Sequence, residues 1–272
     1  MKLIGYPLLT ILVLASLLSV GVVMAGNDDG DNVEIGIEYI MDYAPLGIWW
    51  IPNLDNTGLD AQGWYNVLGN QGFTPVFNNG NQSADESHFE RSDDADWADN
   101  VDFAYFAGHG NSTGFLFATN NPNHLASYDQ MTLGDQDLEW LFVSACSVLQ
   151  YSTRWQWCNI FASYGLHGMT GFDTSMPDTP TLGSLFAYYL TGTNGFPLRS
   201  IGDAWKHATI DDIDDGDIYA AILCRAQYDP VTGILTFNYY DEQMPGYGSG
   251  MYPDPDPMFI GNYYYENWAC ED

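Results

Sequence analysis

The sequence predicts an α/β fold that is built on a mostly parallel β-sheet. Three compact apolar runs, at 103–107, 138–145 and 166–172, each stop abruptly at a small or polar residue. Stretches with the apolar spacing of helices separate these runs. Strands that are apolar along their whole length are typical of parallel sheets, because helices or loops cover both faces of such sheets.

The remaining elements follow from local patterns in chain order. Alternating apolar residues over 33–40 predict the first strand, and Trp64, Val67 and Leu68 predict a helix over 59–71. A short strand follows at 73–77, and the polar, acidic stretch 78–100 is predicted to be mainly loop. Three further helices are expected at 148–164, 181–191 and 201–209. Two strands at 219–228 and 233–240 and an aromatic, extended tail over 244–257 form a small C-terminal β extension.

The N-terminal segment has the pattern of an export signal. Lys2 is followed by an uncharged run that reaches Ala25, and small residues stand before a cleavage point at Gly26. The run is also long enough to span a bilayer without being cleaved. We therefore predict a signal peptide or membrane anchor over 1–25, a linker over 26–32, and a chain that is secreted or tethered to the outer face of the membrane.

The charge of the chain restricts its partners. The formal net charge is −30, from 36 acidic and 6 basic residues. Such a surface repels phosphate backbones and excludes nucleic acid as a partner. It favours solubility, and it allows calcium as a stabiliser. The acidic run 211–217 lacks the spacing of an EF-hand loop, so a solvated loop is the favoured interpretation.

Two apolar runs end in residues that can perform chemistry. His109, within Gly108-His109-Gly110, follows the run 103–107, and Cys146 follows the run 138–145. Reactive side chains gather at the carboxyl ends of parallel strands, so neighbouring strands would bring the two side chains into one crevice. An imidazole can take the proton of a thiol and later deliver one to a leaving amine.

These motifs resemble those of the clan CD cysteine peptidases, the group of caspases, gingipains, clostripain, legumain and separase. The resemblance covers roughly 33–190 and implies a caspase-haemoglobinase-like three-layer sandwich over 33–217, with 218–272 packed on the same domain. It implies a secreted endopeptidase that cuts peptide or protein substrates with a His109/Cys146 dyad and needs no cofactor. The backbone amides of Gly110 and Cys146 would bind the oxyanion. The Gly171-Phe172-Asp173 segment is similar to the one that supplies a pocket for a basic side chain in separase-like members, which nominates Asp173.

One position departs from the family pattern. Ser147-Val148-Leu149 follows the cysteine, where caspases and gingipains usually carry a glycine. This departure leaves a catalytically inactive, exported binding or cell-surface module on the same fold as the alternative.

The four cysteines allow three full disulfide pairings. If Cys146 is a working thiol, we expect a Cys224–Cys270 bridge that ties down the C-terminal region, with Cys158 as a buried thiol. A Cys146–Cys158 bridge is the competing arrangement, and it would abolish thiol chemistry.

Other residues receive structural interpretations. No close cysteine pair is present, so the sequence predicts no metal site. His167 is expected to be a hydrogen-bonded core histidine, and Trp155 and Trp157 are expected to pack in the core. No spacing of acidic residues nominates the carboxylate pair of a glycosidase.

Overall fold

The computed structural model describes residues 32–44, 51–118, 124–162, 165–229, 231–255 and 262–271. The predicted export signal, most of the linker and part of the aromatic tail lie outside these ranges. Among the described residues, no helix is long and apolar enough to cross a membrane.

In the part of the chain that the structure describes, eight strands form one central sheet. Seven of them follow the order β10-β9-β8-β7-β3-β1-β2, and the eighth, β11, pairs with β9 on the edge that faces away from β8. The strands are β1 (Glu34–Tyr39), β2 (Thr74–Gly80), β3 (Phe103–Ala107), β7 (Trp140–Ser144), β8 (Gly168–Phe172), β9 (Asp215–Tyr228), β10 (Leu235–Asn238) and β11 (Tyr263–Cys270). The strands β2, β1, β3, β7 and β8 run parallel, and β9 pairs antiparallel with β8. The predicted α/β class with a mostly parallel sheet is therefore confirmed.

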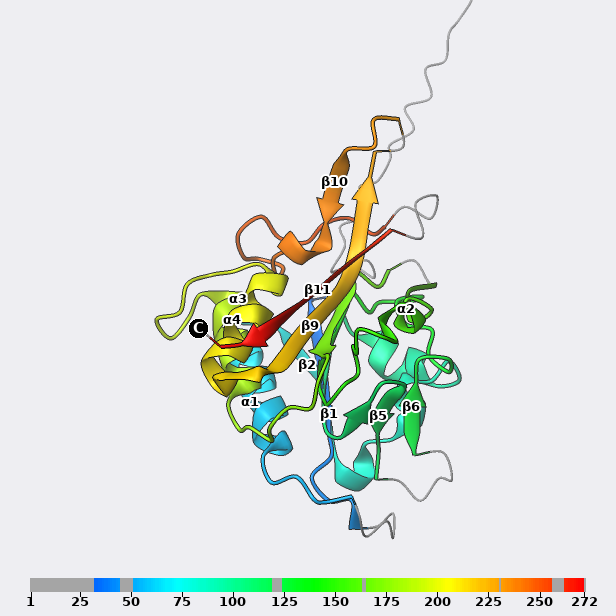
Figure 1. The fold of residues 1–272 in the computed structure, drawn as a ribbon, viewed down its shortest axis with the longest axis vertical. Helices are drawn as coiled ribbons and strands as arrows, with labels where there is room; N and C mark the ends of the chain where they lie inside the picture. The colour runs from blue at the N-terminus through cyan, green and yellow to red at the C-terminus, as the bar shows by residue number, and fades with distance from the viewer. Residues whose placement is uncertain are drawn as a thin grey trace, which may run out of the picture.

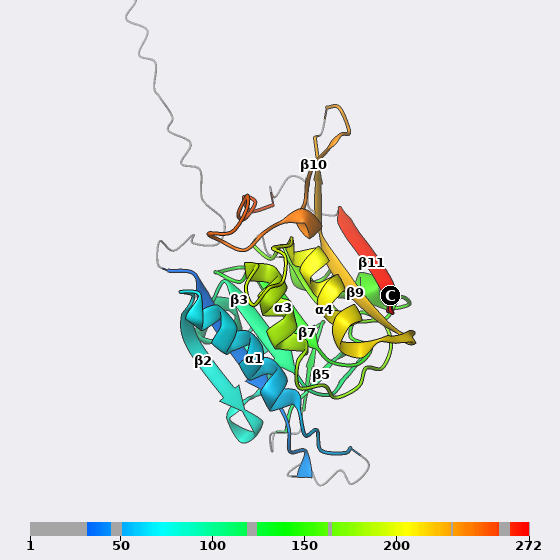
Figure 2. The ribbon, with the colours of Figure 1, turned by 90° about the vertical axis from the view of Figure 1, so that its left-hand side faces the viewer.

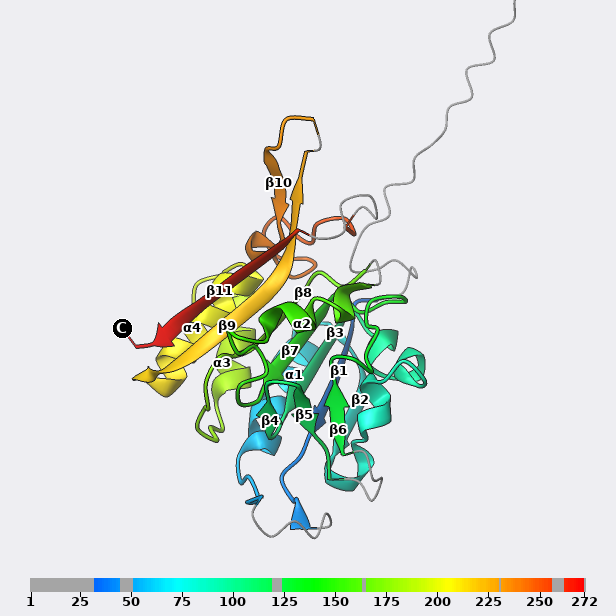
Figure 3. The same ribbon diagram turned by 45° about the vertical axis from the view of Figure 1, so that its right-hand side comes forward.

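The sheet is the middle one of three layers. One face is covered by the helices α1 (Thr57–Asn70), α3 (Leu182–Thr191) and α4 (Ile201–Ile213), which lie in front of the strands in Figure 2. The other face carries α2 (Arg154–Trp157), short 3-10 turns and a small sheet of β4 (Gly110–Asn111), β5 (Gly114–Leu116) and β6 (Leu125–Ser127), as Figure 3 shows. A separate apolar core fills each interface, an arrangement consistent with the caspase-like fold.

The helices form where the sequence places an apolar face toward the sheet. Ala61, Trp64 and Leu68 of α1 are fully buried, and the Trp64 ring stacks on Tyr105 of β3 with 5.4 Å between centroids. Ser200 caps α4 by accepting the Asp203 N–H. Gly192 ends α3 with φ at 64°, a left-handed conformation that glycine adopts without steric cost.

The structure corrects three elements of the sequence prediction. The helix predicted over 148–164 is reduced to α2 and a 3-10 turn, Ile160–Ala162, because tight turns occupy the residues after Cys146. The strand β11 lies beyond the predicted extended tail and pairs with β9 along its full length. The acidic run 211–217 is the end of α4 and the start of β9, with Asp214 as the left-handed C-cap, so it is not a loop.

The C-terminal β extension is continuous with the central sheet. Strand β9 begins at Asp215 and crosses the boundary expected between 217 and 218. Figure 1 shows β9 (yellow-orange) passing along the sheet to reach β10, and Figure 3 shows β11 (red) lying beside β9. The extension therefore completes the sheet and is not an appendage.

Candidate active site

The strands that precede His109 and Cys146 are neighbours. Strands β3 and β7 pair in parallel with Ala107 opposite Ser144, and the Gly108 N–H donates to the Ser144 carbonyl at 3.1 Å. Both chains therefore leave the sheet at the same edge and at the same level. The expectation from the sequence that these two strand ends adjoin is confirmed.

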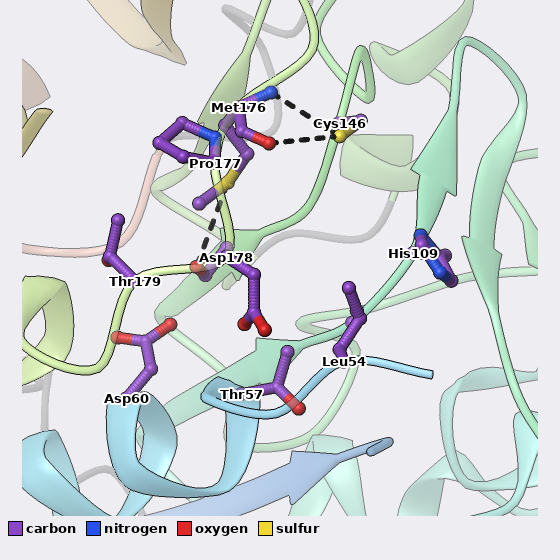
Figure 4. Close-up of a pocket in the computed structure, with 11 residues that line it drawn as sticks. Leu54, Thr57, Asp60, His109, Cys146, Met176, Pro177, Asp178 and Thr179 are labelled. Carbon is purple, nitrogen blue, oxygen red and sulfur yellow. Dashed lines mark hydrogen bonds between the residues drawn. The ribbon is translucent and has the colours of Figure 1, made fainter. Parts of the chain in front are cut away.

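His109 and Cys146 line one narrow pocket, shown in Figure 4. The cavity volume is about 60 Å³, enough for on the order of four water molecules. Such a space suits one slender side chain. The pocket is lined by Leu54, Thr57, Asp60, Gly108, His109, Ser144, Cys146, Met176, Pro177, Asp178 and Thr179.

His109 is held by Tyr43 and by a backbone carbonyl. The backbone N–H of His109 donates to the hydroxyl of the buried Tyr43 at 2.8 Å, and that hydroxyl donates to the Leu116 carbonyl at 3.2 Å. The ring of His109 lies 4.7 Å from that of Tyr43, and its Nε2 lies 2.9 Å from the Pro52 carbonyl. Because a carbonyl only accepts, Nε2 must carry the hydrogen, which leaves the lone pair of a neutral imidazole on Nδ1.

Cys146 is half-buried and its sulfur contacts the loop between β8 and α3. The Met176 N–H lies 3.4 Å from Sγ, and the Met176 carbonyl lies 3.7 Å from it. The thiol thus accepts a hydrogen bond from the Met176 N–H and donates one to the Met176 carbonyl. No hydrogen bond joins Cys146 to His109 among the described residues, so the two groups share the pocket without touching.

The turn after Cys146 is strained. Ser147 has φ at 57°, in the left-handed region that non-glycine residues rarely adopt. The Ser147 N–H donates to the Thr174 carbonyl at 2.9 Å, which holds the turn in place. Ser147 therefore holds a backbone conformation that glycine would adopt without steric cost, at a cost of about 1–2 kcal/mol.

Gly110 packs directly against the backbone of Cys146. A Cβ at position 110 would lie 2.8 Å from the Cys146 carbonyl oxygen and 2.9 Å from Ala145 Cβ. Only glycine permits this approach, which brings the two backbone segments nominated for the oxyanion hole into contact.

Two carboxylates line the pocket opposite the thiol. Asp60 is buried on α1, and it accepts hydrogen bonds from the Tyr105 hydroxyl at 3.0 Å and the Gly183 N–H at 2.6 Å. Burial raises the pKa of Asp60 from 3.8 to about 7. Asp178 accepts the backbone N–H groups of Asp55 at 2.7 Å and Asn56 at 3.0 Å. In Figure 4, both carboxylates point into the space between α1 and the loop that joins β8 to α3.

Asp173, the sequence candidate for a pocket acid, is not among the residues that line this pocket. One of its carboxylate oxygens accepts the Tyr151 N–H at 2.7 Å, and the other accepts the Asn267 side-chain amide at 2.7 Å. The residue joins the turn after Cys146 to β11, which is a structural task.

The cysteines also differ from expectation, because all four are free. Cys224 lies opposite Tyr264 in the β9–β11 pair, whereas Cys270 lies opposite Asp215 at the far end. Six residues of strand separate these positions, about 20 Å at ~3.3 Å per residue. The predicted Cys224–Cys270 bridge is therefore wrong, and the competing Cys146–Cys158 bridge is absent as well.

Two further residues can be placed. His167 is fully buried and hydrogen-bonded to Glu242, as predicted for a core histidine. Trp157 is fully buried, but Trp155 is 53% exposed, so only one of these two tryptophans packs in the core.

Sequence reasoning missed Tyr43, Asp60, Met176 and Asp178. A signal for Asp60 is present in hindsight, because Asp60, Trp64 and Leu68 follow the i, i+4, i+8 spacing of one helix face. An acid on the apolar face of a helix is expected to be buried. Tyr43, Met176 and Asp178 lie in irregular segments, where no periodicity indicates the direction of a side chain.

The fold and the site define a class: an α/β protein with a thiol and an imidazole at adjoining strand ends and buried acid beside them. The chain belongs to the DUF6345 family, described as a domain of unknown function, whose profile matches residues 37–267.

No curated protein matches the chain. Among solved structures, the chain is similar to a secreted C11 cysteine protease from Bacteroides thetaiotaomicron, "iotapain", with 9% identity and a TM-score of 0.39. The match covers 74% of this chain and 73% of that chain. A likeness this distant carries no argument about chemistry, so the function rests on the geometry of the site.

Proposed function

We propose that the protein is a cysteine endopeptidase with Cys146 as nucleophile and His109 as acid and base. The observation that supports the proposal most directly is the shared pocket at the ends of β3 and β7, which contains both side chains. We further propose that the chain acts outside the cell, as its uncharged N-terminal run indicates.

In this mechanism the Cys146 sulfur attacks the carbonyl carbon of the scissile peptide bond. Nδ1 of His109 takes the thiol proton and delivers it to the leaving amine, which departs as the C–N bond breaks. Water then hydrolyses the thioester and restores the thiol. Since the Pro52 carbonyl holds Nε2–H, the imidazole is oriented for proton transfer at Nδ1.

The amides of Gly110 and Cys146 would bind the oxyanion that forms on the attacked carbonyl. The close packing of Gly110 on the Cys146 backbone supports this assignment. One such donor contributes a factor of ~10²–10³ to the rate.

The substrate preference follows from the acids of the pocket. We assign the pocket to a basic side chain, arginine or lysine, next to the scissile bond, with Asp60 and Asp178 as its partners. Asp60 is 1% exposed, and a guanidinium or ammonium group that reaches it would pair with a carboxylate in a weakly screened position. This assignment replaces Asp173 by residues that line the cavity.

The test is labelling of the purified protein with a peptide acyloxymethyl ketone that carries arginine before the warhead, followed by mass spectrometry. We expect modification at Cys146 that is abolished in Cys146→Ala and strongly slowed in His109→Ala. Asp60→Asn should lose the preference for arginine over leucine probes, whereas Asp173→Asn, the matched control outside the pocket, should keep it.

Two outcomes would contradict parts of the proposal. Labelling of Cys146 that does not depend on His109 would contradict the proposed role of His109 as acid and base. A complete lack of labelling with arginine, aspartate, asparagine and leucine probes would exclude the peptidase and leave the exported binding module.

A further inference from the structure

A second cluster of ionisable side chains lies at the edge of the sheet opposite the pocket. Glu139 directly precedes β7 and His167 directly precedes β8, and the His167 N–H donates to the Glu139 carbonyl at 2.7 Å. The third member, Asp254, comes from the segment that follows the 3-10 turn Tyr239–Asp241. In Figure 1 this orange segment lies at the upper end of the sheet, and the blue loop after β1 lies at the lower end.

Glu242 fixes the orientation of the His167 ring. His167 is fully buried, and its Nδ1 lies 3.0 Å from each carboxylate oxygen of Glu242. The same carboxylate accepts the Trp140 indole N–H and the Tyr252 backbone N–H, both at 2.6 Å. Because an ionised carboxylate only accepts, Nδ1 carries the hydrogen and Nε2 points away from Glu242.

The Nε2 side of the ring faces two other carboxylates. It lies 3.0 Å from Glu139 Oε2 and 3.7 Å from Asp254 Oδ1. His167 is completely buried, and with its hydrogen on Nδ1 the neutral ring turns the Nε2 lone pair toward these two carboxylate oxygens. Lone pairs and ionised carboxylates only accept, so a cation between them would satisfy all three groups.

We propose that Glu139, His167 and Asp254 bind a divalent transition-metal ion of the zinc type. Their ligand atoms all lie within 4.8 Å of one another. Ligands that surround zinc tetrahedrally at 2.0–2.2 Å are themselves about 3.3 Å apart, a value between the 3.0 and 3.7 Å observed here.

The donor set selects the kind of metal. An imidazole nitrogen suits zinc and its neighbours in the first transition row, whereas calcium and magnesium prefer oxygen ligands alone. Glu242 then acts as the outer partner that holds the ligating histidine in the right tautomer, an arrangement common at zinc sites. Water would complete the coordination.

Charge balance supports a dication over a proton. Three carboxylates, those of Glu139, Glu242 and Asp254, surround one imidazole. A protonated histidine offsets one of these negative charges, whereas a dication with a neutral imidazole offsets two. Buried charge without compensation is costly, so the dication is the better occupant.

The site would fasten the C-terminal segment to the sheet. The Tyr239 hydroxyl donates to the Pro253 carbonyl at 2.7 Å, which already positions the residue next to Asp254. Strand β7 lies between this site and the thiol pocket, so the ion has a structural task and takes no part in the chemistry at Cys146.

The experiment uses the full secreted chain after treatment with a chelator. Zinc is titrated in excess magnesium and salt, because the acidic surface binds cations without specificity. Bound zinc is measured by mass spectrometry of the metal, and the ligand environment is measured by the visible absorption of the cobalt form. Asp254→Asn and Glu139→Gln remove one ligand each, and Asp241→Asn is the matched control on an exposed acid nearby.

We expect one zinc ion per chain, an increased melting temperature with zinc, and an absorption spectrum typical of four-coordinate cobalt. Asp254→Asn and Glu139→Gln should weaken zinc binding at least 10-fold, and Asp241→Asn should leave it unchanged. Binding that is equal in wild type and Asp254→Asn, or no binding above the level of magnesium competition, would overturn the proposal and leave a protonated His167 in the cluster. Asp254 is half-buried, so its substitution leaves a folded chain for the comparison.

Discussion

The substitution Asp60→Asn should make the protein more stable at neutral pH. Asp60 is buried, and burial raises the pKa of its carboxyl group from 3.8 to about 7. The Tyr105 hydroxyl and the Gly183 N–H both donate to the same oxygen, Oδ1. An asparagine oxygen in that place accepts both bonds, so the substitution removes the charge and keeps the hydrogen bonds.

The pH dependence follows from proton linkage. Between pH 4 and 7 the folded chain keeps a proton on Asp60 that the unfolded chain has lost, so stability falls as the pH rises through this range. The interval from 3.8 to about 7 corresponds to about 4 kcal/mol, at 1.36 kcal/mol for each pKa unit. Asparagine carries no such penalty. The variant should therefore gain stability over wild type by roughly 2–3 kcal/mol more at pH 8 than at pH 5.

Urea unfolding of both proteins at pH 5, 6, 7 and 8 measures this difference. A stability difference between Asp60→Asn and wild type that does not change with pH would refute the reasoning, because Asp60 would then be ionised at little cost. Under the proposed function, pairing of Asp60 with a basic substrate side chain would offset this cost.

Three other changes test the pocket. Ser147→Val should lower the free energy of unfolding by about 1–2 kcal/mol while Ser147→Gly does not, because φ at 57° is unfavourable for a β-branched residue; urea titration measures both, and equal stability of the two variants would contradict the strain. Gly110→Ala should slow the labelling of Cys146 at least 10-fold, because the added Cβ would lie only 2.8 Å from the Cys146 carbonyl oxygen. An unchanged labelling rate would show that the backbone moves to accept the Cβ without harm to the site. Tyr43→Phe should lower the free energy of unfolding by about 1–2 kcal/mol and slow the labelling of Cys146, because it leaves the backbone N–H of His109 without its acceptor. Urea unfolding and labelling assays measure the two effects. Wild-type values in both assays would show that Tyr43 does not position His109.

The parts of the fold that could be predicted from sequence are those in which the local pattern and the burial agree. The strands at 103–107 and 166–172 are buried along their whole length because both of their faces are covered, and their predicted bounds agree with β3 and β8 to within two residues. The stretch 148–164 also contains many apolar residues, yet its described part forms mainly turns, because Ser147 and the hydrogen bonds to the β8–α3 loop fix the chain direction after Cys146. Strand β11 was missed, since most of its side chains are only half-buried and it is held mainly by backbone pairing with β9.

The same distinction applies to the site. That His109 and Cys146 line one pocket could be predicted, because the two residues follow neighbouring parallel strands. The pocket acid could not be chosen from strand ends alone: Asp173 and Asp178 lie five residues apart in one loop, and only the path of that loop decides which one lines the cavity.

The pairing of β9 with β11 has a consequence for biogenesis. Residues 220–224 of β9 are apolar and buried between β8 and β11, and β11 begins 35 residues after β9 ends. Until Tyr263–Cys270 has arrived, the outer edge of β9 presents unpaired backbone groups beside an apolar strand, which is a template for aggregation. Chains that end before Tyr263 should therefore associate through β9, and productive folding of this sheet should wait until the whole of β11 has been synthesised.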